Sequence, residues 1–515
     1  MRGFWAWALC APFVVILGGC AGGGAADGQM TEELAARTIS SALEDIEDFY
    51  FREADASALV KAGLTTVEDN HPSLRFIHGG DTIVVNVSEA AVFDFRTAAD
   101  HGAADVWGDR VAAALQHIAT AEPGAGPDLT VLTDTFLRGV ADSLDGYTHY
   151  APRKRVSVNV RHFSARLGTL NIGVQHEDAG WRVRYIYSVP LRNARLLRKG
   201  DVILEIDGVS TLPLSQTEVL AHLLGEEGSP ISLTVSRPGS PTPLALHLQR
   251  EASDANSVAT FPDDAAWHVQ VTQFAGKSID AMRDLLSDET KGPQPDATGI
   301  VLDLRDNPGG LLDSVVEFAD LFLSDGRIAD THGRHRDSHQ YFFARKTAPK
   351  TSLPLVVLID EGSASGSEIV AAALQANGRA VVIGSASFGL GTIRTALPLP
   401  NVGDLIVTWA EVTTPDNYRL DKRGVMPTIC TGGRVTAEEV VAALRSGGGM
   451  IDHAIRIRDI DPEDTAAVAA FRALCPPRED GADDVALEVA KAILADAALY
   501  DRILAAGPQR VSSGP

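Results

Sequence analysis

The sequence is poor in cysteine and in basic residues, and each shortage narrows the possible functions. Four cysteines occur in 515 residues, without the Cys/His spacing that is typical of a zinc site. Lysine and arginine number 45 against 68 acidic residues, which gives a formal net charge of -23. Because nucleic-acid phosphates need a basic face, this balance argues against a nucleic-acid partner. We therefore expect no nucleic acid, no metal and no cofactor.

The N-terminal apolar run, Phe4–Leu17, is too short for a stop-transfer helix. Arg2 precedes this run, and Leu17-Gly18-Gly19-Cys20 ends it. A basic start, a short apolar core and a small-residue end are typical of a secretory signal peptide, which we place at residues 1–19. The ending resembles a bacterial lipobox, which implies cleavage before Cys20 and a lipid on its thiol. An ordinary signal peptide with a chance cysteine is the alternative.

The expected location follows from this leader. Ala21 resembles the outer-membrane sorting signal of lipoproteins, so we expect an anchor on the periplasmic face of the outer membrane, with glycine-rich residues 20–30 as a tether. Cys430 and Cys475 are the two thiols that remain beside a lipidated Cys20. An oxidising periplasm permits a disulfide between them, and two buried free thiols are the alternative.

The length suits two or three domains, each with its own core. Residues 31–152 have mainly helical patterns, with one possible strand at Thr82–Val87. Residues 160–250 contain short strands between turns, and residues 255–430 alternate strands with helices. Residues 431–515 are alanine-rich and helical in pattern, and their role cannot be inferred from the sequence.

A serine cluster is the first candidate site. The apolar run Leu355–Ile359 predicts a strand, and a small-residue segment then leads to a helix over Glu368–Leu374. Free backbone N–H groups at a helix start can stabilise an oxyanion. Ser363, Ser365 and Ser367 are therefore candidate nucleophiles, with helix N-capping as the alternative role.

A glycine-rich turn lies about 55 residues upstream. Gly299–Asp303 predicts a buried strand, followed by Asn307-Pro308-Gly309-Gly310 and an amphipathic helix over Leu311–Leu323. This is a strand–helix unit of a sheet that is covered on both faces.

Together these segments resemble the C-terminal processing (tail-specific) peptidases, which are Ser-Lys proteases with a built-in PDZ domain. The likeness rests on Ser-Ala-Ser-Gly-Ser-Glu-Ile, Phe-Gly-x-Gly-Thr and Asn-Pro-Gly-Gly, and it covers roughly residues 130–430. It implies a multidomain α+β protein with an α/β core of the ClpP/crotonase type. It also implies that Ser365 is the nucleophile and that Gly366, with Gly309 or Gly310, supplies the oxyanion hole.

Residues Lys199–Val209 are very similar to a PDZ module. The resemblance implies a groove that binds a protein C-terminus as an added strand and holds its carboxylate on backbone amides. The carboxylate loop would lie near Gly168, Thr169 and Leu170, where the match is poor.

Three positions depart from the family pattern. The general-base lysine position is Leu390, the family's glutamine four residues later falls on Arg394, and an aspartate often found directly after the helix glutamine falls on Ala376. In a Ser-Lys pair, a desolvated amine takes the serine proton and returns it to the leaving amine. Leucine can do neither, so the protein needs another base or is not an efficient protease.

Few residues could replace the lysine. Glu368 is expected on a helix that points away from Ser365, and Arg394 is a poor base because its pKa stays above about 12. Histidine has a suitable pKa. The other candidates, all in one polar stretch, are His332, His335, His339, Lys346 and Lys350.

Three functions remain open. The first is a periplasmic serine endopeptidase that acts on unfolded or tail-tagged envelope proteins. The second is a pseudoprotease that binds protein tails or partners as a scaffold. The third is a structural envelope protein. Intact Ser365, Gly309 and Gly310 favour the first two, whereas Leu390 and Arg394 favour the second over the first.

Overall fold

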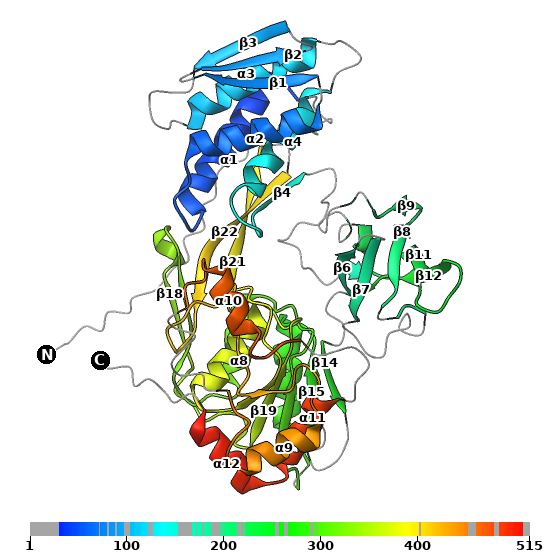
Figure 1. Cartoon of the computed structure of the whole chain (residues 1–515), viewed down its shortest axis with the longest axis vertical. Coiled ribbons are helices and arrows are strands. Elements are labelled where there is room, and N and C mark those ends of the chain that lie inside the picture. The colour runs from blue at the N-terminus through cyan, green and yellow to red at the C-terminus, as the bar shows by residue number, and fades with distance from the viewer. Residues whose placement is uncertain are drawn as a thin grey trace, which may run out of the picture.

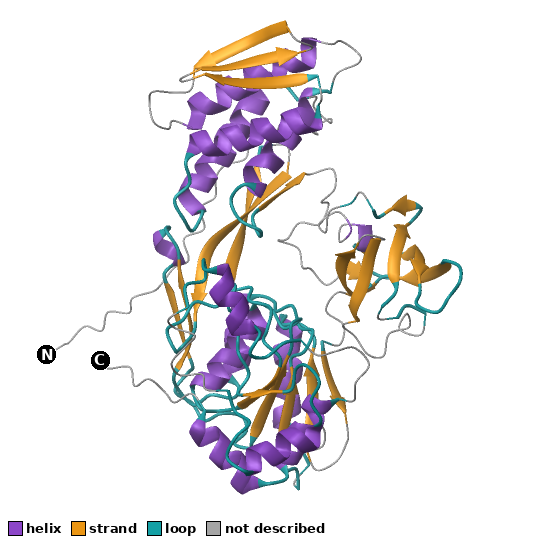
Figure 2. Cartoon of the chain, viewed as in Figure 1, coloured by secondary structure: helices purple, strands orange, loops and turns teal. Residues whose placement is uncertain are grey.

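The structure is a computed structural model of the whole chain, shown in Figures 1 and 2. It describes residues 30–71, 73–79, 82–87, 90–96, 104–121, 127–152, 167–170, 172–177, 180–186, 196–198, 200–212, 214, 219, 222–252, 257–261, 266–288, 292–294, 296–400, 403–451, 460–477 and 484–507. The expected signal peptide and Cys20 lie outside these residues. No described helix is long and apolar enough to cross a membrane.

The N-terminal region is a helical bundle that carries a small sheet (Figure 1). Its helices are α1 (Glu32–Phe49), α2 (Ala56–Asn70), α3 (Ala104–Ala121) and α4 (Leu129–Asp142), and its antiparallel strands are β1 (Leu74–Gly79), β2 (Thr82–Val87) and β3 (Ala90–Arg96). Thr31, Asp55 and Asp128 cap three of these helices through their side-chain oxygens. The strand expected at Thr82–Val87 is confirmed, whereas its two partner strands were not expected.

The central sheet holds the serine segment. Its order is β14 (Val258–Phe261), β15 (Ala266–Val271), β16 (Gly299–Asp303), β19 (Leu355–Ile359), β20 (Val381–Gly384) and β23 (Ile429–Cys430), all parallel except β14. Every residue of β16, β19 and β20 is buried, as expected for strands covered on both faces. The helices α6 (Gly276–Ser287), α7 (Leu312–Asp320) and α8 (Gly366–Ala376) pack into the core cluster on one face.

Helices beyond residue 430 cover the opposite face of this sheet. These helices are α9 (Ala437–Arg445), α11 (Val485–Leu494) and α12 (Ala497–Ala506), and the remaining one, α10 (Thr465–Arg472), packs near the serine segment. Val489 and Ile493 of α11 pack in one cluster with Val301 of β16. The Tyr500 hydroxyl accepts a hydrogen bond from the Leu355 amide (2.9 Å). The C-terminal helices are thus a layer of the core, a role that the sequence did not reveal.

A second sheet joins this core to the N-terminal bundle (Figure 1). Its order is β18 (Gln340–Phe343), β17 (Arg327–His332), β22 (Gly403–Thr413) and β21 (Thr392–Leu399), with β4 (His149–Pro152) also paired to β22. The far end of the β21–β22 hairpin places Leu399, Leu405 and Val407 in the apolar cluster of the bundle.

Residues 167–252 form a separate β module with its own apolar core (Figure 2). One sheet has the order β12 (Leu244–Gln249), β11 (Pro230–Ser236), β8 (Val202–Ile206), β7 (Gly180–Ile186) and β6 (Ile172–Glu177), with β9 (Val209–Ser210) paired to β8; the other is β10 (Gly225–Glu226), β5 (Leu167–Thr169) and β13 (Glu251–Ala252). The helix expected at Leu214–Leu224 lies largely outside the described residues.

Candidate active site

Ser365 occupies a strained turn between β19 and α8. Its backbone angles are φ 53° and ψ -111°, a region that costs a residue with a β-carbon about 1–3 kcal/mol. The neighbouring Ala364 amide donates a hydrogen bond to the Asn307 carbonyl (2.9 Å), and the Ser365 carbonyl accepts from Ile369 N (3.1 Å). A serine held in strain at a strand-to-helix turn is typical of a nucleophile.

The hydrogen bonds distinguish the three candidate serines. The Ser363 hydroxyl donates to the Leu304 carbonyl (2.8 Å), and the Ser367 hydroxyl donates to the Asn307 carbonyl (2.8 Å). Both side chains are fully buried. Ser365 is the N-cap residue of α8 by position, as the alternative expected, but its hydroxyl makes no capping hydrogen bond; the Glu368 amide donates to the Ser365 carbonyl instead (3.0 Å). Ser363 and Ser367 hold the turn in place, and Ser365 is the serine whose hydroxyl is not used in this way.

Gly309, Gly310 and Gly366 lie against Ser365. A β-carbon at Gly309 would come within 2.5 Å of the Gly366 nitrogen and 2.9 Å of the Ser365 β-carbon, and one at Gly366 would lie 3.3 Å from the Gly310 nitrogen. The Gly309 amide already donates to Asn307 Oδ1 (2.8 Å). Gly366 is the first residue of α8, so its N–H has no partner within the helix. Of the two alternatives from the sequence, this arrangement favours the Gly310 amide over that of Gly309.

Glu368 is the residue that the sequence analysis placed wrongly. Its carboxylate does not point away from Ser365: Oε2 accepts hydrogen bonds from the amides of Ser365 (2.8 Å) and Leu390 (2.9 Å). Oε1 accepts from the Ser387 hydroxyl (2.6 Å) and the Gly389 amide (2.7 Å). Burial raises the pKa of this carboxyl above its ordinary value, and the four hydrogen bonds oppose that rise.

Leu390 therefore lies near Ser365, because one Glu368 oxygen binds the amides of both residues. Its amide and the Ser365 amide donate to the same Glu368 atom, while its half-buried side chain carries no group that can accept a proton. Arg394 is exposed on β21, and Ala376 is buried at the end of α8. The family's lysine position is thus close to Ser365, and a hydrocarbon occupies it.

The candidate substitute bases lie around β17 and β18. The His335 ring stacks on Phe49 of α1 with 5.0 Å between ring centroids, and the His332 and His339 rings are 5.4 Å apart. Lys346 and Lys350 are exposed beyond β18. In the described part of the chain, no lysine or histidine nitrogen is hydrogen-bonded to the Ser365 hydroxyl. The described residues also contain no group of three His, Cys, Asp or Glu side chains that could hold a metal ion.

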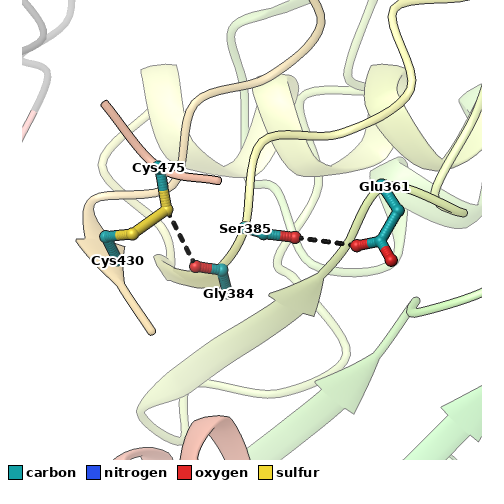
Figure 3. The surroundings of a disulfide bond; sticks show 5 residues. All are labelled: Glu361, Gly384, Ser385, Cys430 and Cys475. Carbon is teal, nitrogen blue, oxygen red and sulfur yellow. Dashed lines mark hydrogen bonds between the residues drawn. A yellow bond between two sulfur atoms is a disulfide. The ribbon is translucent and has the colours of Figure 1, made fainter. Parts of the chain in front are cut away.

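The disulfide lies beside the loop that leads to Leu390 (Figure 3). Cys430 and Cys475 are bonded, with 5.6 Å between their α-carbons. Cys475 Sγ lies 3.2 Å from the Gly384 carbonyl oxygen, a contact without a proton because the sulfur is oxidised. The Ala386 amide donates to the Cys475 carbonyl (3.2 Å). The cross-link joins the segment after α10 to β23, and the Ala386 amide holds the same segment against the loop that follows β20.

The expected carboxylate loop lies in the β module. Both edges of β5 are paired, since Gly168 pairs with Gly225 and Ala252, and Thr169 pairs with Glu251. Leu170 follows with a buried side chain. The next strand, β6, pairs with β7 alone among the described strands. β6 and β12 are thus the two edge strands of this sheet, and β6 is the one that follows the predicted loop along the chain.

Comparisons with known proteins agree with these motifs. The model of Peptidase family S41 matches residues 267–431. The carboxy-terminal-processing protease of Bartonella bacilliformis is 33% identical over 305 residues, which cover 59% of this chain and 70% of that protein. The carboxyl-terminal-processing protease of a Picosynechococcus species is 36% identical over 231 residues, which cover 44% of this chain and 55% of that protein.

Solved structures include one relative of lower identity. The photosystem II D1 C-terminal processing protease is 24% identical, with a TM-score of 0.47 over 61% of this chain and 84% of that one. The family assignment rests on the Bartonella protein, of which more than two thirds is matched at 33% identity. The chain belongs to peptidase family S41, the family of the carboxy-terminal processing proteases.

Proposed function

We propose that this chain binds polypeptides in the manner of its family but turns them over very slowly, because its general base is missing. One observation carries the proposal: Leu390 occupies the lysine position, and its amide shares a Glu368 oxygen with the amide of Ser365. The protein would then act as a scaffold that holds protein tails or partners in the envelope.

The remaining groups could bind a peptide carbonyl. Ser365 would face it, and the amides of Gly310 and Gly366 would hold the oxyanion. Attack by Ser365 requires that its hydroxyl proton leave for a base, and protonation of the departing amine requires an acid. Loss of one member of such a unit costs about 10⁴ to 10⁶ in turnover, with a residual rate from the oxyanion hole.

The β module would supply the binding site for protein tails. A peptide would add to the open edge of β6 as an extra strand, with its C-terminal carboxylate near Thr169 and Leu170. The module would thereby act as a PDZ domain. The module has its own apolar core, and it is built from other segments than the Ser365 site. This separation supports a binding role for the module that does not depend on Ser365.

We further infer that the chain is a lipoprotein of the periplasmic face of the outer membrane. The lipobox-like ending at Cys20 supports this location, and so does the disulfide, because such bonds persist in oxidising compartments. A Cys20→Ser protein should leave the membrane fraction. Retention in that fraction would point to another anchor.

A binding experiment tests the proposed function. Fluorescently labelled, unstructured peptides with a free C-terminus are titrated with the protein, and anisotropy and mass spectrometry are recorded together. We expect binding that weakens when the C-terminus is amidated, and full recovery of the peptide. Absence of binding, or cleavage that disappears in Ser365→Ala, would contradict the proposal.

An active peptidase is the second candidate, and the strain at Ser365 favours it. A φ of 53° at a serine persists where the surroundings impose it, and such strain has no evident value in a scaffold. This alternative requires a base outside the contacts described above. Cleavage by the wild type, followed by loss of activity in a His332, His335 or His339 variant, would identify that base.

A further inference from the structure

The disulfide fastens the segment after α10 to the core at the end of β20 (Figure 3). Gly384, the last residue of β20, pairs with Cys430 of β23, and Cys430 is bonded to Cys475. The Ala386 amide donates a hydrogen bond to the Cys475 carbonyl (3.2 Å). The segment after α10 is thus held on the core by a covalent bond and by a backbone hydrogen bond.

The loop after β20 also supplies the donors that hold Glu368. The Ser387 hydroxyl (2.6 Å), the Gly389 amide (2.7 Å) and the Leu390 amide (2.9 Å) donate to its carboxylate. The Ser365 amide donates to the same carboxylate (2.8 Å). The hydroxyl donor comes one residue after the amide that is bonded to the segment beyond α10. A displacement of that segment is therefore transmitted to the donors of Glu368 and to the turn at Ser365.

The two sulfur atoms of the disulfide differ in access. Cys475 is fully buried in the main core, whereas Cys430 packs against that core and is partly exposed. In thiol–disulfide exchange, a thiolate attacks one sulfur and expels the other, and access decides which sulfur it reaches. A thiolate from solvent therefore attacks Cys430 Sγ, and Cys475 Sγ is the leaving group.

The buried leaving sulfur has an acceptor for the proton that it gains. Cys475 Sγ lies 3.2 Å from the Gly384 carbonyl oxygen. In the disulfide this contact has no proton, but a thiol at the same place donates its S–H to the carbonyl. The Thr431 amide donates to the same oxygen (2.8 Å), and a carbonyl oxygen has two lone pairs. The reduced state therefore buries a thiol whose proton is hydrogen-bonded.

We propose that this disulfide is a redox switch of the Ser365 site, which a dithiol reductant opens at Cys430. One thiolate of the reductant forms a bond to Cys430 Sγ, and Cys475 Sγ leaves and takes a proton from water. The second thiolate then attacks the sulfur of the reductant in this mixed disulfide and releases Cys430 as a thiol. Two electrons pass to the protein, and the dithiol becomes a cyclic disulfide. The segment after α10 then loosens, and the donors of Glu368 lose their support.

The effect on ligand binding rests on the proposed function, in which the turn at Ser365 holds a peptide carbonyl. We expect reduction to weaken the binding of a peptide at this turn. The β module should be unaffected, because residues 167–252 have a separate apolar core. A peptide with an amidated C-terminus probes the Ser365 site, since the module would hold a free carboxylate.

Amide hydrogen exchange, measured by mass spectrometry, tests the switch without any ligand. The full chain is compared before and after treatment with dithiothreitol under native conditions. We expect the amides of residues 386–390 to exchange at least about tenfold faster after reduction, because local opening sets their exchange rate. The amides of β11, in the separate module, should exchange equally in both states.

A monothiol identifies the sulfur that is attacked. Wild-type protein is incubated with reduced glutathione, quenched with acid and digested, and the mixed disulfide is located by mass spectrometry. We expect glutathione on Cys430 and a free thiol at Cys475. This measurement needs no variant.

Two variants separate the covalent bond from its surroundings. Cys430→Ala keeps the Cys475 thiol, so residues 386–390 should exchange as in the reduced wild type and should not respond to dithiothreitol. Ser385→Ala is the matched control, because it removes only the neighbouring bond to Glu361 (3.1 Å, Figure 3) and keeps the disulfide. The control should exchange slowly until the reductant is added.

Three outcomes would overturn the proposal. The first is equal exchange of residues 386–390 in the oxidised and the reduced protein. The second is glutathione on Cys475. The third is a disulfide that dithiothreitol cleaves only in urea. Faster exchange after reduction, together with unchanged binding of the amidated peptide, would support the switch and contradict the proposed binding of peptides at Ser365.

Discussion

At the scale of single residues, Gly309 sets how closely the glycine turn approaches Ser365. Its φ is +99°, and a β-carbon there would lie 2.5 Å from the Gly366 nitrogen. We expect Gly309→Ala to lower the free energy of unfolding by about 2–4 kcal/mol, because strain and a backbone clash add together. Gly378 is the matched control, since its φ is +62° and nothing lies within 4 Å of an added β-carbon.

Urea denaturation of Gly309→Ala and Gly378→Ala separates the cost of the left-handed backbone conformation from the cost of the backbone clash. Gly378→Ala should cost about 1 kcal/mol, the penalty of the left-handed conformation alone. If the two variants were equally destabilised, the close contact between the glycine turn and the start of α8 would be wrong.

Glu368 joins the turn at Ser365 to the loop that carries Leu390. Glutamine would keep one acceptor oxygen and would turn an NH₂ group toward N–H donors, so buried donors would lose their partners. We expect Glu368→Gln to lower the free energy of unfolding by about 2–4 kcal/mol, measured by urea denaturation. Glu361→Gln is the control: Glu361 accepts one bond from Ser385 (3.1 Å, Figure 3) and should cost under about 1 kcal/mol. If both substitutions lowered the free energy of unfolding equally, the four hydrogen bonds of Glu368 would not stabilise the fold more than the single bond of Glu361.

The residues around Ser365 were partly predictable from the sequence. The family motif pointed to Ser365 and to the glycine turn, and the hydrogen bonds of Ser363 and Ser367 now explain why those serines differ. The pattern Ser365-Gly-Ser-Glu368 is that of a capping box, which predicts the bond from Glu368 to the Ser365 amide. Its bonds to Gly389 and Leu390 join positions about 20 residues apart and leave no local pattern.

At the scale of elements, the C-terminal helices carry a share of the core's stability. Ile493 of α11 is fully buried against the central sheet. Truncation of such a side chain removes its burial and leaves a cavity, so Ile493→Ala should cost about 2–5 kcal/mol in chemical denaturation. Leu474→Ala, at a side chain that is 49% exposed, is the control and should change little. If Ile493→Ala changed the free energy of unfolding only slightly, α11 would contribute little to the stability of the core.

A buried charge cluster ties α11 to the sheet and gives the fold a pH dependence. Burial acts to raise the pKa of Asp303, but the Arg305 charge and hydrogen bonds from Arg305 and His268 outweigh it and hold that pKa well below its usual range. Arg305 also contacts Asp484, the N-cap of α11 (2.7 Å).

A carboxylate with a lowered folded-state pKa adds stability above its unfolded pKa and loses it as the pH falls. We expect the free energy of unfolding to drop as the pH is lowered below about 4, and Asp303→Asn to flatten that drop. Denaturation curves of the wild type and of Asp303→Asn at several pH values measure how the free energy of unfolding depends on pH. An unchanged pH dependence in the variant would contradict this assignment.

Element positions were predictable where an apolar pattern was strong. The all-apolar strands β16 and β19 indicated a sheet covered on both faces, and α8 was expected close to its observed bounds. The helices that form the second layer could not be assigned, because an amphipathic pattern defines a helix face but not its partner. The partner strands β1 and β3 were missed in a region whose pattern was mainly helical.

At the scale of the whole molecule, the β21–β22 hairpin links the site to the N-terminal bundle. β21 begins at Thr392, two residues after Leu390, and its far end packs in the bundle's core through Leu399. Arg52, which follows α1, contacts Glu463 (2.6 Å), and Lys422 contacts the same carboxylate (2.8 Å). The sequence did not predict this arrangement, because the contacts of the bundle, such as that between Arg52 and Glu463, join segments hundreds of residues apart.

The central claim is that Ser365 lies in a formed site without an efficient base. The most direct test measures cleavage of an unfolded protein substrate by the wild type and by Ser365→Ala at equal concentrations, with products identified by mass spectrometry. A family member that carries the lysine serves as the positive control. The account predicts that the wild type cleaves no faster than Ser365→Ala. Cleavage by the wild type that Ser365→Ala abolishes would contradict it.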